Sequence, residues 1–131
     1  MLKFGLVGQT LGHSFSKPYH NQRFEHLGIN AVYDNYELKN ASEVRELFLC
    51  IPELHGVNVT IPYKSQVMVY LDSIDADASS VQAVNTIARR GVELVGYNTD
   101  VYGFEVSLLG FLQGEVKQAL VLGTGGAAKA V

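Results

Sequence analysis

The sequence of 131 residues contains a single cysteine, Cys50, so no disulfide can form within the chain. A chain without disulfides is typical of a reducing compartment, which predicts a cytoplasmic protein. Cys50 lies in the apolar run LFLCI. We therefore expect Cys50 to be a buried core residue and not a nucleophile.

The sequence also lacks a basic run and a long apolar run. Its formal net charge is −3, which argues against nucleic acid as the main partner. No apolar stretch approaches the roughly twenty residues that cross a membrane. The opening residues, MLKFGLVGQT, have neither the apolar segment nor the cleavage site of a secretory signal. We expect a protein that binds neither nucleic acid nor a membrane.

The hydrophobic content of 47% is sufficient for a core, and strand-like and helix-like segments alternate. Strand patterns cover residues 2–8, 31–38, 55–61 and 118–123, and residues 84–98 indicate a hairpin around Arg90 and Gly91. Helix patterns cover residues 17–28, 40–50, 75–81 and 100–112, with one more helix starting at Pro62. This order predicts an α/β fold with a largely parallel sheet flanked by helices.

Polar clusters follow three of these strands: GHSFS, TIPYK and GYNTD. Ligands of parallel sheets bind beyond the carboxyl ends of the strands. Lys64 would lie about two residues inside the helix that Pro62 starts, where the helix dipole disfavours a cation. Such a misplaced charge is typical of a functional site. Ser16 is expected to cap the first helix.

The last residues, LVLGTGGAAKAV, read as an apolar strand followed by a glycine loop. This pattern opens a dinucleotide-binding βαβ unit, where glycines let the backbone approach a pyrophosphate. We expect a substrate-binding domain over residues 1–100, a connecting helix over 101–115 and the truncated start of a Rossmann domain over 116–131. The apolar strand without a sheet is expected to be disordered or to pair with a neighbouring chain.

Four segments and the glycine loop together resemble shikimate dehydrogenase. They are GQTLGHSFSKPYHN, GVNVTIPYK, AVNT and GYNTDVYG, followed by GTGGAA. The resemblance implies an oxidoreductase that reduces 3-dehydroshikimate to shikimate with NADPH, on the route to chorismate and the aromatic amino acids. It also implies that the 131 residues are a fragment, inactive alone because most of the cofactor domain is missing.

The resemblance assigns roles to individual residues. Ser14 and Ser16 match the serines that hold the substrate carboxylate, and Thr60 matches a substrate-contacting threonine. Lys64 matches the catalytic lysine. Asn85 and Asp100 match residues that bind the ring hydroxyls, with Asp100 beside the lysine in a catalytic role. The loop of Gly123, Thr124, Gly125, Gly126 and Ala127 matches the start of the NADP-binding site.

The sequence departs from the family at three positions and leaves alternatives open. Thr10 replaces a usual proline, Lys17 follows the second serine where proline is usual, and Gln82 replaces a glycine before AVNT. A dehydrogenase that favours quinate or NAD is one alternative, and a non-catalytic shikimate-binding module is another. The four histidines have no metal-ligand spacing, so no metal site is expected.

Overall fold

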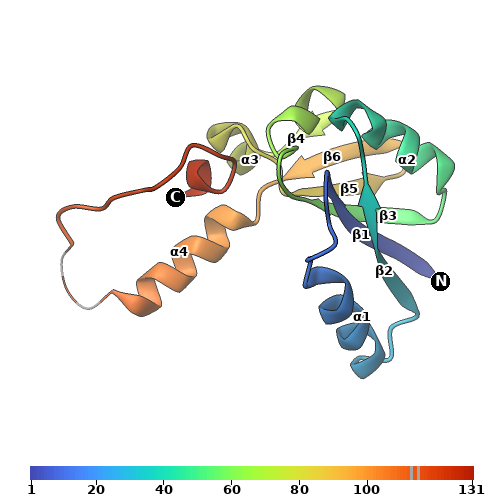
Figure 1. Ribbon diagram of the computed structural model, residues 1–131, viewed down its shortest axis with the longest axis horizontal. Helices are drawn as coiled ribbons and strands as arrows, with labels where there is room; N and C mark the ends of the chain where they lie inside the picture. Colours follow the sequence, from blue (N-terminus) through green and yellow to red (C-terminus); the bar gives the residue numbers. More distant parts are fainter. Residues whose placement is uncertain (113, 115) are drawn as a thin grey trace.

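The computed structural model describes residues 1–112, 114 and 116–131. Its centre is one six-stranded sheet in the order β2-β1-β3-β5-β6-β4 (Figure 1). The strands are β1 Leu2–Gly8, β2 Ala31–Glu37, β3 Leu54–Val59, β4 Ser73–Ile74, β5 Thr86–Arg90 and β6 Glu93–Tyr97. The α-helices are α1 Ser16–His26, α2 Val44–Cys50, α3 Ala76–Val81 and α4 Asp100–Phe111. Three 3-10 segments are η1 Ala41–Glu43, η2 Gln66–Tyr70 and η3 Ala128–Ala130.

The α/β prediction is confirmed, and the sheet is parallel over most of its pairs. β1 pairs in parallel with β2 and β3, and β4 pairs in parallel with β6. β5 is antiparallel to both β3 and β6. The predicted hairpin is the β5–β6 pair, and Gly91 at its turn has φ +63°, a conformation that glycine adopts without strain. The carboxyl ends of β1 and β3 therefore open at one edge of the sheet.

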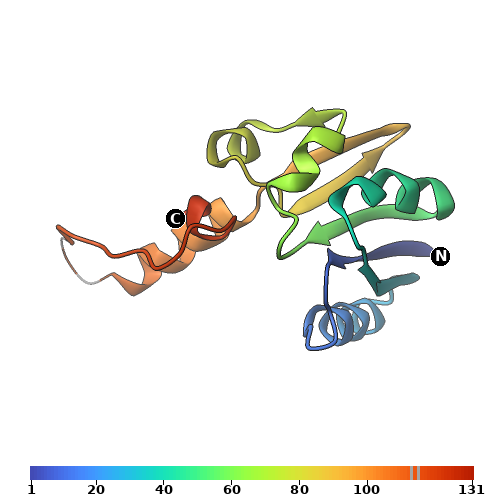
Figure 2. The ribbon, with the colours of Figure 1, turned by 45° about the horizontal axis from the view of Figure 1, so that its top comes forward.

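The two faces of the sheet are covered unequally. In Figure 2, α1 lies below the sheet and α2 above it. The larger core is on the α2 side and includes Val7, Val44, Leu54 and Ile87, each at 0% exposure. The core on the α1 side is smaller. It consists of Leu6, Leu11 and Tyr33, with Phe4 and Phe24 packed against them.

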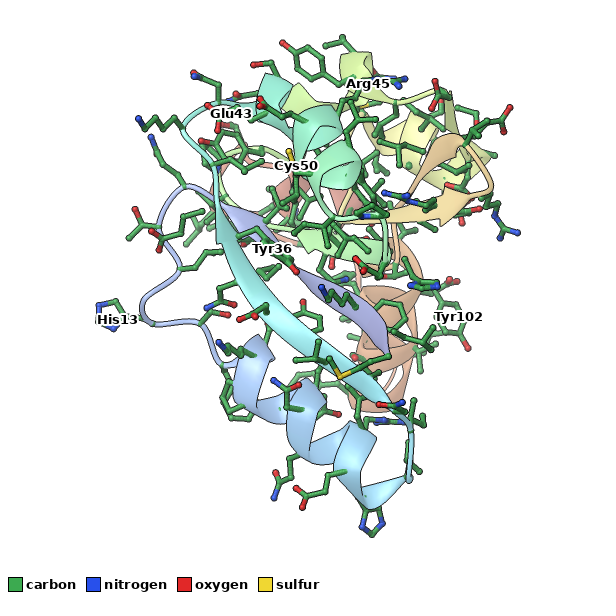
Figure 3. All side chains as sticks on the ribbon, turned by 90° about the vertical axis from the view of Figure 1, so that its right-hand side faces the viewer. His13, Tyr36, Glu43, Arg45, Cys50 and Tyr102 are labelled. Carbon is green, nitrogen blue, oxygen red and sulfur yellow. The ribbon has the colours of Figure 1, made fainter. Side chains whose placement is uncertain are left out.

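Cys50 is exposed, so the prediction of a buried thiol was wrong. α2 buries Val44 and Phe48, which are four residues apart and share a helix face. Cys50 comes two residues after Phe48, and two residues turn an α-helix by about 200°. Figure 3 labels Cys50 at the end of α2. The apolar residues next to Cys50 in the sequence therefore did not determine which side of α2 this residue occupies.

No helix starts at Pro62. Residues 61–65 form turns, and the first helical segment after them is η2, which begins at Gln66. The Ile61–Pro62 peptide is cis. The Lys64 carbonyl accepts from the Val84 N–H over 2.7 Å, a tertiary bond that takes the place of a helical one. The helix-dipole argument for Lys64 was therefore wrong, although the residue itself lies in the site described below.

Gln82, one of the three departures from the family pattern, has an unusual backbone conformation. It follows α3 with φ +52° and ψ +41°, the left-handed conformation that favours glycine at a helix end. Its carbonyl accepts from the Ser65 hydroxyl over 2.8 Å. The glycine usual at this position in the family would adopt this conformation without strain.

The last part of the chain leaves the sheet. α4 extends away from it, and residues 116–131 run back beside α4 (Figures 1 and 2). No strand forms over residues 118–123, so that strand prediction was wrong for this structure. The residues Leu120 and Leu122 are 83% and 86% exposed. A strand needs a partner, and none of the six strands pairs with this segment.

Candidate active site

An ion pair joins two predicted site residues. Lys64 lies in the turn after β3, and Asp100 is the first residue of α4. The Lys64 Nζ donates to the Asp100 Oδ2 over 2.6 Å. The lysine side chain is 17% exposed and the aspartate side chain 35% exposed. The pair is thus partly shielded and still within reach of a small molecule.

A buried amide holds the other carboxylate oxygen. Asn85 is 7% exposed, and its Nδ2 donates to the Asp100 Oδ1 and the Thr99 Oγ1, each over 2.8 Å. The Asn85 Oδ1 accepts from the Thr99 N–H over 2.9 Å. Because a backbone N–H can only donate, this bond determines how the amide is turned. Lys64, Asn85 and Asp100 therefore form one cluster.

Asn98 is a site-building residue that sequence reasoning missed. It is 5% exposed, and its Nδ2 donates to the Ala83 carbonyl over 2.8 Å. Its Oδ1 accepts from the N–H groups of Asp100 and Val101 over 2.9 and 3.3 Å. These are the first two N–H groups of α4, which have no partner within the helix. Asn98 ties the start of α4 to the strand region and so places Asp100. The asparagine directly before Thr-Asp in GYNTD was its sequence signal.

The serine loop connects β1 to α1. Ser14 Oγ accepts from the Ser16 N–H over 3.2 Å, while Ser16 is already the first residue of the helix and caps nothing. The capping prediction for Ser16 was therefore wrong, and Ser14 is the serine whose side chain bonds to the backbone at the helix start. Among the described residues, neither serine hydrogen-bonds to Lys64, Asn85 or Asp100.

Thr60 lies at the same edge of the sheet. Its N–H donates to the Val7 carbonyl over 2.9 Å. A Cβ added at Gly8 would lie 2.8 Å from the Thr60 Cγ2, so the glycine allows the ends of β1 and β3 to approach. Lys17, which departs from the family pattern, donates to Asp34 over 2.5 Å.

The glycine loop contacts the lysine. A Cβ added at Gly126 would lie 2.7 Å from the Lys64 Cβ, so only glycine fits there. Gly123 has φ +125°, and a Cβ at Gly125 would meet nothing within 4 Å. A cavity of about 400 Å³ is lined by Asp100, Gly103, Ala127 and Ala130, among others. The bare backbone of the loop fits the close approach of a dinucleotide phosphate.

A second cavity, of about 300 Å³, lies on the α1 face of the sheet. Besides apolar residues, its lining includes His20, Tyr33, His55, Asn58 and Thr86, and neither Lys64 nor Asp100 lines it. Sequence reasoning did not single out Tyr33, Asn58 or Thr86. Asn58 stands between Val57 and Val59, and a polar residue within an apolar strand was the available signal.

Burial raises the pKa of the Tyr33 phenol from 10 to about 12, while a hydrogen bond from the Ser16 side chain acts in the opposite direction. Burial also lowers the pKa of His20, and the nearby Arg23 contributes to the same shift. His20 stacks on the Tyr33 ring, with 4.4 Å between ring centroids. Tyr33 is thus strongly favoured in its neutral, donating form.

The raised pKa predicts a loss of stability at alkaline pH. The unfolded chain releases the Tyr33 proton near pH 10, while the folded chain keeps it to about pH 12. The free energy of unfolding therefore falls as the pH rises from 10 to 12, by about 2 to 3 kcal/mol from this group. Denaturant unfolding across this range should show a smaller fall in Tyr33→Phe than in the unaltered chain. Equal slopes would refute the assignment.

No group of three or more potential metal ligands occurs in the part of the chain that the structure describes. His13 projects outward from the serine loop (Figure 3). Within residues 1–112, 114 and 116–131, no helix has the length and apolar character needed to cross a membrane.

The fold and the site define an α/β domain with a polar cluster beside the carboxyl end of β3. The family model "Shikimate dehydrogenase substrate binding domain" matches residues 6–87. The chain belongs to this family.

Comparison with individual proteins extends the match to nearly the whole chain. The NADP(+) shikimate dehydrogenase of Halothermothrix orenii is 46% identical over 97% of this chain and 45% of its own length. The crystal structure of shikimate dehydrogenase 1 from Peptoclostridium difficile matches with a TM-score of 0.91, 42% identity and coverage of 99% and 49%. The Thermus thermophilus enzyme in complex with NADP(H) and shikimate matches with a TM-score of 0.84, 34% identity and coverage of 100% and 50%. The chain spans about half the length of the relatives it matches.

Proposed function

We propose that this chain is the substrate-binding part of an NADP-dependent shikimate dehydrogenase, which interconverts 3-dehydroshikimate and shikimate. The single observation that carries the proposal is the Lys64–Asp100 pair held by buried Asn85, within a chain of this family. The similar Thermus enzyme is described in complex with NADP(H) and shikimate, which supports the same ligands here.

Lys64 is proposed as the general acid for carbonyl reduction. NADPH, when bound, supplies the hydride. As the ring carbonyl carbon is reduced, negative charge grows on its oxygen. The Lys64 ammonium stabilises that charge and donates a proton to it. Asp100 holds the Lys64 Nζ through one oxygen, which leaves two further N–H bonds of the ammonium available to the substrate. The reverse reaction returns the proton to the neutral amine.

The remaining predicted residues are proposed as binding groups. Ser14 and Ser16 would hold the substrate carboxylate at the serine loop, and Thr60 and Asn85 would bind the ring. Asp100 would accept a hydrogen bond from a ring hydroxyl in addition to orienting the lysine. All belong to loops at the sheet edge or to the cluster around Asp100, as a ligand of an α/β sheet requires.

For the cofactor, we propose that residues 116–131 open a dinucleotide-binding unit, after the substrate domain of residues 1–100 and the connection of residues 101–115. Gly123, Thr124, Gly125, Gly126 and Ala127 would line the phosphates. The exposed Leu120 and Leu122 support pairing of residues 118–123 with a further strand, in this protein or in a neighbouring chain. The cytoplasmic location stays a prediction.

The test is NADPH oxidation by the complete protein that carries this chain, with 3-dehydroshikimate as substrate. We expect turnover with 3-dehydroshikimate, and oxidation of shikimate in preference to quinate in the reverse direction with NADP⁺. Preference for quinate or for NAD would shift the assignment to the related dehydrogenase. Binding of shikimate without any turnover would leave a binding module and contradict the enzyme.

Ser14→Ala is expected to raise the KM for shikimate and leave kcat nearly unchanged. The variant removes a hydrogen bond to the substrate carboxylate, which is made equally in the ground state and the transition state. The expected loss is on the order of 1 to 3 kcal/mol. Steady-state kinetics of the complete protein measures it, with Ser42→Ala at an exposed position of η1 as the control. A lower kcat at unchanged KM would speak against carboxylate binding by Ser14.

A further inference from the structure

A continuous row of hydrogen bonds crosses the sheet from β2 to the catalytic cluster. The Tyr33 hydroxyl donates to the Asn58 Oδ1 over 2.8 Å, and the Asn58 Nδ2 donates to the Thr86 Oγ1 over 3.2 Å. These residues come from β2, β3 and β5. All three line the cavity on the α1 face. Tyr33 thus reaches across β1 to a residue on β3.

The row continues into the cluster around Asp100. The Thr86 Oγ1 donates to the Asn85 Oδ1 over 3.0 Å, and the Asn85 Nδ2 donates to the Asp100 Oδ1 over 2.8 Å. The Asp100 Oδ2 then accepts from Lys64. We name the five residues Tyr33, Asn58, Thr86, Asn85 and Asp100 the polar row.

Every donor in the polar row points the same way, and the Asn85 end requires that direction. At one end, the Thr99 N–H fixes the Asn85 Oδ1 as an acceptor. The Thr86 hydroxyl has one proton, so donating it to Asn85 leaves only acceptor capacity toward Asn58. At the other end, the Tyr33 hydroxyl donates to Asn58. The Asn58 amide can then adopt only one of its two orientations.

We propose that Tyr33 is a positioning residue of the substrate site. Through Asn58 and Thr86 it determines which way the site presents its N–H donors, without touching the reacting atoms. The Asn58 Nδ2 carries two hydrogens, and among the described residues one of them bonds to Thr86. With the amide held by Tyr33, the second N–H keeps one direction and can donate to a hydroxyl oxygen of a polyol ring. This inference rests on the proposed function.

The Tyr33 ring and the Tyr33 hydroxyl have separable roles. The ring stacks on His20 and packs with Leu6 and Leu11. Tyr33→Phe keeps these contacts and removes only the donor to Asn58. The Asn58 Oδ1 then loses its donor and only the bond to Thr86 still holds the amide, so the amide can more readily turn over and accept from Thr86. That turn withdraws the Thr86 proton from Asn85 and weakens the cooperative row.

The experiment compares variants of the complete protein. In Tyr33→Phe we expect the KM for shikimate to rise about 3- to 10-fold and kcat to stay within about twofold, since one neutral hydrogen bond is lost. Thr86→Val breaks the row on the other side of Asn58 and should raise KM similarly. Thr86→Ser keeps the hydroxyl and should therefore have the KM of the unaltered protein. The double variant Tyr33→Phe with Thr86→Val should cost less than the sum of the two effects.

The matched control is Tyr36→Phe. Tyr36 lies on the same strand but packs on the other face, against the larger core. Its hydroxyl makes no hydrogen bond within the part of the chain that the structure describes. Tyr36→Phe should leave KM unchanged.

A second readout is the NMR signals of the side-chain amides of Asn58 and Asn85. Both should shift in Tyr33→Phe, and neither should shift in Tyr36→Phe. Thermal unfolding identifies variants that lose the fold. If Tyr33→Phe is one of them, comparison of Thr86→Val with Thr86→Ser decides whether the polar row affects the KM for shikimate.

An unchanged KM in Tyr33→Phe, with the unaltered protein active, would overturn the positioning role alone. Equal increases in KM in Tyr33→Phe and Tyr36→Phe would show a general packing effect and would also overturn the positioning role of Tyr33. Absence of shikimate turnover by the unaltered protein would overturn the proposed function. In that case the amide signals decide whether Tyr33 orients Asn58, and unshifted signals would refute it.

Discussion

Replacing Lys64 by alanine is expected to lower kcat by roughly 10²- to 10⁴-fold in the complete protein, the usual range for the loss of a general acid. The lysine is only 17% exposed and its Nζ lies 2.6 Å from the Asp100 Oδ2. Its charge is therefore held in one place, beside the glycine loop that packs on its Cβ. Alanine removes both the proton and the charge that stabilises the forming alkoxide.

A second variant separates these two contributions. Lys64→Arg keeps a positive charge, but a guanidinium does not release its proton at ordinary pH. If proton donation dominates, Lys64→Arg should be nearly as slow as Lys64→Ala. Lys3→Ala, which removes a lysine from a surface pair with Glu53, is the control and should retain kcat. Near-normal kcat in Lys64→Ala would exclude the lysine from the mechanism.

Replacing Asn98 by alanine is expected to lower the free energy of unfolding by about 2 to 4 kcal/mol. The buried amide bonds to the first two N–H groups of α4 and to the Ala83 carbonyl. Alanine removes the partners of the helix start, which costs about 1 kcal/mol, and leaves a buried carbonyl unpaired, which costs about 1 to 3 kcal/mol more. Denaturant unfolding of this chain measures the loss directly.

The control for Asn98 is Asn40→Ala. Asn40 also stands before a helical segment, but its side chain forms no cap bond. Its replacement should change stability by less than about 0.5 kcal/mol, as is usual for surface positions. In the complete protein, Asn98→Ala should also lower activity, since it frees the start of α4 and with it Asp100. Equal stability of the Asn98 and Asn40 variants would contradict the anchoring role.

Local pattern was a reliable guide where one segment decides its own structure. β1 spans residues 2–8 as predicted, and the hairpin around Arg90 and Gly91 forms as β5 and β6. Strand-forming side chains and a glycine turn depend on neighbours in sequence. Motifs also selected Lys64, Asn85 and Asp100, which the fold brings into one hydrogen-bonded cluster, although the helix-dipole reason given for Lys64 did not hold.

Local pattern failed where a distant partner decides. Cys50 is exposed because Val44 and Phe48 select the buried side of α2. Pro62 starts no helix, and the Lys64 carbonyl bonds to Val84 instead. Residues 118–123 have the composition of a strand but pair with none of the six strands. In each case the local structure depends on contacts with residues outside the segment, or on the lack of such contacts.

By itself the sequence determined the fold class, the family and the types of side chain available for carbonyl reduction. Only the tertiary structure brought Lys64 and Asp100 together across 36 positions and Tyr33 and Asn58 across 25. Hydrogen-bond direction along the polar row depends on the geometry of side chains from three strands. No periodicity in one segment encodes that geometry, because it arises only when the strands pair in the order β2-β1-β3-β5.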